Sequence, residues 1–262
     1  MSRKLSNAPV YFTIVQARFN PIMALDSYAA EIQERFRKLG YPDFEKNFLA
    51  TFNLNMGAPD GNQSQVPVAH TGRYVFQNME KTAGFFLDPG SLSYQTTEYD
   101  VFETFSQEFF NGLKIVHDTV QLSYTDRIGF RYLDAIFPRA GESIEDYLNP
   151  WMMGLSGRID GEIVHSFVET VLKTASAQIT ARSIMQNGAI GFPPDLAPGS
   201  LVVPERFTSL RGPHAILDMD GSHERREAFD IANVKSRLLE IHGEIAKSFR
   251  ATVTDSAMRV WA

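Results

Sequence analysis

Residues 120–137, VQLSYTDRIGFRYLDAIF, are the stretch that decides the fold. Its two apolar runs are rich in the aromatic and β-branched residues that strands favour. Between the runs, Thr125-Asp126 predicts either a turn or a bulge. The second run, residues 127–136, mixes aromatic side chains with charged ones, and we interpret it as a central strand of the sheet.

Polar side chains in this second run point in alternating directions. Successive side chains of a strand face opposite ways, so Arg131 shares a face with Leu133, and Tyr132 shares the other face with Asp134. An arginine surrounded by an apolar sheet needs a partner, because burying an unpaired charge is costly. Arg131 is therefore predicted either to bind a phosphate or carboxylate group as a two-pronged fork, or to be structural, in an ion pair or on a solvated sheet face. The structural role is the favoured interpretation.

Outward from this stretch, apolar residues recur at spacings typical of strands and of helices in a mixed order. Residues 8–19 predict a strand with both faces partly buried, or one with a bulge near Ile14. Asp26, Asp230 and Thr254 are predicted to cap helices. Strands are predicted over 8–19, 48–55, 73–78, 84–87, 91–97, 127–136 and 214–220. The apolar spacing at the start of 164–185 also suits a helix, but its threonine and valine content favours two antiparallel strands. Helices are predicted over 27–39, 101–113, 143–148, 231–249 and 255–261.

This order of elements predicts an α+β fold, with mostly antiparallel sheets and helices packed on one face. An N-terminal half, residues 1–141, is expected to pack against a C-terminal half, residues 142–262, as a single unit without a clear linker. A duplicated ferredoxin-like layout is one arrangement of such halves. Gly/Pro-rich loops are predicted over 57–67 and 188–198, the second long enough to serve as a lid or an interface arm.

Composition excludes several classes of site. Hydrophobic residues make up 44% and charged residues 21% of the 262 positions, as in an ordinary globular domain. The absence of cysteine excludes disulfides and thiolate metal sites. A formal net charge of −6 lacks the basic footprint of duplex binding, so nucleic acid is not a favoured partner.

The expected location is the cytoplasm. No segment approaches the roughly 20 consecutive apolar residues that span a bilayer, so no membrane partner is expected. The first residues, MSRKLSNAPV, lack the apolar region of a secretory signal.

Two aspartates are candidate metal ligands. Asp218 and Asp220 share one face of a predicted strand, roughly 7 Å apart by strand rise. They could chelate a divalent cation if a third oxygen ligand converged on them, whereas paired carboxylates at this spacing also occur on solvated strands. The residues that follow lack the ligand order of an EF-hand. A divalent cation is thus the one candidate cofactor, and no other is predicted.

Motifs for other chemistry are missing from the sequence. There is no H-E-x-x-H for zinc, no G-x-S-x-G elbow, and no Walker or G-x-G-x-x-G loop for nucleotides. His242 borders the apolar stripe of the last long helix, and we interpret it as a histidine packed between helix and sheet in preference to a general base. Together with Arg131, Tyr132 and Asp134 it completes the set of candidate binding residues.

Several short motifs, taken in order, carry a resemblance to a known family. They are N-A-P-V at 7–10, R-x-x-F at 73–76, R-I-G-F-R-Y-L-D at 127–134, L-D-M-D at 217–220, His242 and F-R-A-T-V-T-D at 249–255. On these motifs, which span nearly the whole chain, the protein resembles a sporadically distributed family of uncharacterised bacterial proteins of about this length. Asp134 stands where the family often has asparagine. The resemblance implies a cytoplasmic protein of an accessory or mobile-defence kind and implies no reaction.

Three functional hypotheses follow. The first is a non-enzymatic binding or assembly protein, an accessory or sensor subunit of a bacterial defence or toxin-type system, acting as a homodimer or with an operon-encoded partner. The alternative is a metal-dependent hydrolase or nucleotidyl-type enzyme that uses Asp218, Asp220 and also Asp134. The third is a small-molecule pocket between the sheet and the long helix, with Arg131 holding an anion.

Overall fold

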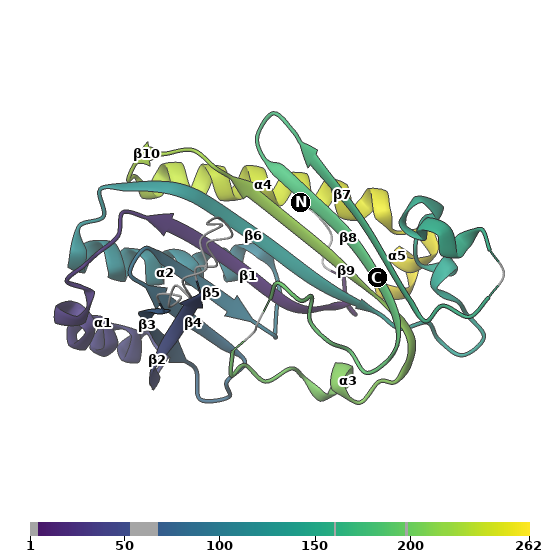
Figure 1. Ribbon diagram of the computed structural model, residues 1–262, viewed down its shortest axis with the longest axis horizontal. Coiled ribbons are helices and arrows are strands. Elements are labelled where there is room, and N and C mark those ends of the chain that lie inside the picture. Colours follow the sequence, from purple (N-terminus) through teal and green to yellow (C-terminus); the bar gives the residue numbers. More distant parts are fainter. Residues whose placement is uncertain (1–4, 53–67, 160, 197–198) are drawn as a thin grey trace, which may run out of the picture.

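An antiparallel sheet of ten strands organises the molecule, in the order β2-β3-β4-β5-β1-β6-β9-β8-β7, with β10 paired to β6 (Figure 1). The computed structural model describes residues 5–52, 68–159, 161–196 and 199–262. The strands are β1 (Val10–Phe19), β2 (Asp43–Phe52), β3 (Val68–Gln77), β4 (Ala83–Asp88), β5 (Ser91–Thr96), β6 (Tyr124–Ile136), β7 (His165–Lys173), β8 (Gln178–Gly188), β9 (Gly212–His223) and β10 (Glu227–Ala228).

The longer helices cover one face of this sheet, and the long connection between β8 and β9, which includes the four-residue helix α3, crosses the other (Figure 1). The predicted α+β class with antiparallel strands is confirmed. The helices are α1 (Leu25–Leu39), α2 (Phe102–Val120), α3 (Glu205–Thr208), α4 (Ile231–Thr252) and α5 (Asp255–Trp261), with short 3-10 turns at Ile144–Asp146, Pro150–Met152 and Gly154–Gly157.

The two predicted halves contribute to one continuous sheet. Strands β1 to β6 come from residues before 141, strands β7 to β10 from residues after 142, and the two sets meet where β6 pairs with β9. The ferredoxin-like halves are not confirmed. Among the described residues, four strands lie between α1 and α2, and β7, β8 and β9 follow one another with only α3 between them.

The stretch 120–137 forms one strand where two strand-like runs were predicted. Its first residue, Val120, ends α2, so the first run was wrongly assigned, because α2 continues about two turns beyond the predicted end at residue 113. Residues 121–123 connect that helix to β6. The bulge is confirmed: Arg18 faces Arg127 but Phe19 faces Thr125, which leaves Asp126 as the extra residue. Near Ile14 the pairing is regular, and both faces of β1 are buried instead.

Two of the three predicted helix caps are confirmed. The Asp230 side chain accepts a hydrogen bond from the Ala232 amide, and Thr254 caps α5 in the same way. Asp26 was wrongly predicted as a cap. Helix α1 begins one residue earlier, and the Asp26 carboxylate accepts hydrogen bonds from the Tyr74 hydroxyl and Lys46. A tertiary partner therefore takes the side chain that local sequence assigns to the helix end.

Three further predictions concern residues 164–185, the segments around residues 48–67 and membrane-spanning helices. The two antiparallel strands within 164–185 are confirmed as β7 and β8. The predicted loop at 57–67 and the end of the predicted strand 48–55 lie outside the described residues. Within the described chain, no helix is long and apolar enough to cross a membrane.

Gly112 lets α2 approach the sheet. A Cβ atom at this position would lie 2.2 Å from a ring carbon of Phe85 on β4. We therefore expect Gly112→Ala to lower the free energy of unfolding by about 1–3 kcal/mol in chemical denaturation. Gly243, within α4, is the matched control, because its added Cβ meets nothing within 4 Å. Gly243→Ala should raise the free energy of unfolding by about 0.5–1 kcal/mol. Equal effects at the two positions would contradict this account of the packing.

Candidate functional site: a pocket between the sheet and helix α4

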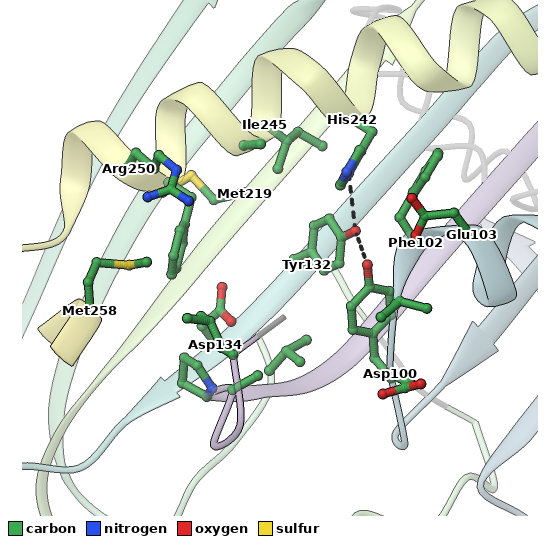
Figure 2. A pocket seen from close by; sticks show the side chains of 18 residues that line it. Asp100, Phe102, Glu103, Tyr132, Asp134, Met219, His242, Ile245, Arg250 and Met258 are labelled. Carbon is green, nitrogen blue, oxygen red and sulfur yellow. Dashed lines mark hydrogen bonds between the residues drawn. The ribbon is translucent and has the colours of Figure 1, made fainter. Parts of the chain in front are cut away.

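A cavity of about 550 Å³ lies on the helix side of the sheet, under α4 (Figure 2). Its volume falls in the range of sites for small organic molecules. Six parts of the chain form its walls: the segment that leads into β1, the segment that leads into α2, strands β6 and β9, and helices α4 and α5. The lining residues are Leu5, Ala8, Pro9, Val10, Tyr99, Asp100, Val101, Phe102, Glu103, Tyr132, Asp134, Met219, His242, Ile245, Ala246, Phe249, Arg250 and Met258.

Local periodicity explains how two of these elements present their side chains. On β6, Tyr132 and Asp134 point to the helix side, as the alternation of the strand predicted. On α4, the lining residues His242, Ile245 and Phe249 recur at spacings of three and four and so lie along one face. The same face of α4 therefore packs against the core and forms one wall of the cavity.

A chain of hydrogen bonds crosses the pocket wall. The hydroxyl oxygens of Tyr99 and Tyr132 lie 2.8 Å apart, and the Tyr132 hydroxyl is 3.3 Å from Nδ1 of His242 (Figure 2). The His242 ring stacks on Phe102, with 3.9 Å between ring centroids. Burial lowers the pKa of His242, and only Glu103 opposes that shift. The imidazole is therefore neutral at pH 7 and lies between helix and sheet, as predicted.

Asp134 is the most unusual group in the pocket. Its side chain belongs to a residue that is 6% exposed, yet it has no hydrogen-bond or ion-pair partner within the described part of the chain. Figure 2 shows its carboxyl group pointing into the space below α4, on the side of Arg250 and Met258. Burial, with the nearby charge of Asp218, raises the pKa of Asp134 to about 7. A buried carboxyl group without a partner is costly, so its retention in a cavity indicates a role in binding.

A separate ion-pair network lies on the opposite face of the sheet. Arg131 donates two hydrogen bonds to Asp218, each of 2.7 Å, and two more of 3.0 and 3.1 Å to Asp195 in the connection after β8. Arg182 on β8 adds a third donor to Asp218 at 2.9 Å. The structural ion pair predicted for Arg131 is confirmed. Through Asp195, it also links the connection between β8 and β9 to the sheet.

The candidate residues therefore divide between two faces. Tyr132, Asp134 and His242 come together in the pocket, whereas Arg131 and Asp218 lie behind the sheet. The idea that Arg131 holds an anion in this pocket is wrong, because strand alternation sends its side chain away from the cavity.

The two candidate metal ligands, Asp218 and Asp220, lie with this network. Both carboxylate oxygens of Asp218 accept hydrogen bonds from guanidinium groups. Asp220 is half-buried on the same side of β9, and burial raises its pKa. In the described ranges, no group of three or more His, Asp or Glu side chains is arranged to hold a metal ion.

Sequence reasoning missed several residues of both sites. Tyr99 and Arg250 line the pocket, and Asp195 and Arg182 complete the network. None of them stands in a motif, and each reaches its site only through tertiary packing. One usable signal was the predicted need of Arg131 for a carboxylate partner.

No protein-family model matches the sequence, and no curated protein matches it either.

Proposed function

We propose that this protein binds a small organic molecule in the pocket under α4 and acts as a ligand-binding or sensor protein. The observation that carries the proposal is Asp134, a buried carboxyl group that has no partner among the described residues and faces a cavity of about 550 Å³. Apolar walls with a few convergent polar groups and a perturbed pKa are typical of small-molecule sites. The sensor role agrees with the accessory kind of protein that the resemblance implies.

The polar groups of the pocket suit recognition. Tyr99, Tyr132 and His242 are already joined by hydrogen bonds, so their positions are fixed before a ligand arrives. Burial raises the pKa of both tyrosine hydroxyls, so they stay protonated and serve as hydrogen-bonding groups. A fixed polar wall beside apolar α4 residues can orient a ligand that has one polar end.

A filling substitution tests the proposal. Ala246 of α4 lines the pocket, and Ala246→Trp should occupy the cavity. With the neutral fluorescent probe N-phenyl-1-naphthylamine, we expect one probe bound per wild-type chain and at least about tenfold weaker binding to the variant.

Ala232→Trp is the matched control for this substitution. Ala232 is exposed in the first turn of the same helix, so the new side chain should leave probe binding unchanged. Circular dichroism and thermal melting of both variants separate a filled pocket from a damaged fold. Undiminished binding by a folded Ala246→Trp variant would overturn the proposed site.

A further inference from the structure

The chemistry of Asp134 narrows the class of ligand. An ionised carboxylate only accepts hydrogen bonds, so its natural partner in the cavity is a donor. A cationic donor makes a stronger bond to a carboxylate than a neutral donor does. At the same time it compensates the charge that burial otherwise penalises. The buried carboxylate of Asp134 therefore favours a ligand with a positively charged group over a ligand with a hydroxyl group.

The groups around Asp134 support a cation. Asp100, just before α2, and Glu103, in the first turn of α2, add two exposed carboxyl groups to the lining. Behind the sheet, the charge of Asp218 adds to the effect of burial, and together they raise the pKa of Asp134.

The remaining polar neighbours do not supply a competing charge in the interior. Tyr99, Tyr132 and His242 are neutral at pH 7 for the reasons given above. Arg250 is exposed at the rim of the pocket on α4. Aromatic rings also form part of the wall, and their faces attract cations.

We propose that the ligand carries a protonated amine on an apolar body, and that the amine forms an ion pair with Asp134. This inference rests on the proposed binding function and names the chemical class of ligand that the pocket binds. The apolar body lies against the α4 residues Ile245, Ala246 and Phe249, and the ammonium group supplies the partner that the carboxylate lacks among the described residues.

Three matched probes test the class of ligand. The compounds 4-phenylbutylamine, 4-phenylbutan-1-ol and 4-phenylbutanoate share one apolar body and differ in the charge of the end group. In isothermal titration calorimetry at pH 8, the amine should bind at least about tenfold more tightly than the alcohol, and the carboxylate most weakly.

The variant Asp134→Asn should remove this preference. It keeps the size of the side chain and abolishes its charge, so the amine should lose about tenfold or more in affinity while the alcohol changes less than about threefold. Glu80→Gln, in the exposed turn between β3 and β4, removes one carboxylate away from the pocket. This control should leave all three affinities unchanged.

The number of protons released on binding is a second measurement, and it reports on the ionisation of Asp134. Pairing with an ammonium group stabilises the ionised carboxylate, so binding of the amine should expel a proton wherever the free carboxyl is still protonated. Titrations in buffers of different ionisation enthalpy should show close to one proton released at pH 6 and almost none at pH 8.5. The Asn variant should release none.

The possible outcomes separate this inference from the proposed function. If the naphthylamine probe binds in the pocket but the alcohol binds as tightly as the amine, the ligand class is wrong and the binding function stands. If Asp134→Asn leaves the affinity for the amine unchanged, the ion pair is likewise wrong. If neither the neutral probe nor any phenylbutyl compound binds, both proposals are wrong.

Discussion

Replacing Arg131 with methionine is expected to lower the free energy of unfolding by about 3 kcal/mol, close to the lower limit for breaking a buried ion pair. The side chain of Asp218 is fully buried, and the substitution removes two of the hydrogen bonds to its carboxylate. Arg182 remains 2.9 Å from Asp218, which limits the loss. Urea unfolding of wild type and variant at pH 7 measures the effect.

A half-exposed pair provides the control for this prediction. Arg73 on β3 makes an equally short two-pronged contact with Asp88, at 2.8 Å for both bonds, but its side chain is 31% exposed. Arg73→Met should therefore cost no more than about 1 kcal/mol. If the two substitutions destabilised the protein equally, burial would not be the reason for the importance of Arg131.

The Arg131 variant also separates stability from binding. Since its side chain lies behind the sheet, the folded fraction of Arg131→Met should bind the naphthylamine probe with wild-type affinity. Loss of probe binding by folded Arg131→Met would show that the two faces of the sheet are coupled.

The opposite result is expected for Asp134→Asn, which should make the free protein more stable at pH 8 by about 2–4 kcal/mol. The pKa of Asp134 is raised from 3.8 to about 7 in the folded protein, chiefly by burial. Ionising it at pH 8 is therefore unfavourable in the fold and free of penalty in the unfolded chain. An asparagine has no charge to bury and escapes this cost.

The raised pKa of Asp134 also determines how the free energy of unfolding changes with pH. Between pH 3.8 and about 7, the folded state holds a proton on Asp134 that the unfolded state has lost. The stability that this proton confers is complete below pH 3.8 and is lost as the pH rises through about 7. The difference between Asp134→Asn and wild type should thus be small at pH 4, grow up to pH 7 and stay constant above it.

Denaturant unfolding from pH 4 to pH 8.5 checks this curve. Glu80→Gln again controls for the loss of one carboxylate from the chain. A variant that is less stable than wild type at pH 8 would mean that the carboxylate has a partner in the fold. A stabilising substitution that weakens amine binding would show that the protein keeps Asp134 at a cost to its stability.

Much of the local structure could be predicted from the sequence, because it depends on neighbouring residues. The alternation of β6 correctly separates Arg131 from Tyr132 and Asp134. The side chain of Asp230 caps α4 as its position predicts. Errors arose where a distant residue competed for a local role, as when Tyr74 and Lys46 took the carboxylate of Asp26.

The sequence could not predict which carboxylate pairs with Arg131. Asp220 stands directly opposite Arg131 in the pairing of β6 with β9, yet the ion pair forms with Asp218, which faces Arg182 on the next strand. Asp218 is 87 residues away in the sequence. A carboxylate between two arginines is better compensated, and only the order of the strands places it there.

By itself, the sequence determined the α+β class, the two directions of the side chains on β6, and the need of Arg131 for a charged partner. Strand and helix periodicity and the cost of a lone buried charge act locally, so they can be read from neighbouring residues. Only the tertiary structure decided that Tyr132, Asp134 and His242 share a cavity, and that no described residue is a partner of Asp134 there. Solvation and pairing of a side chain depend on every element that packs around it, and those elements come from distant parts of the chain.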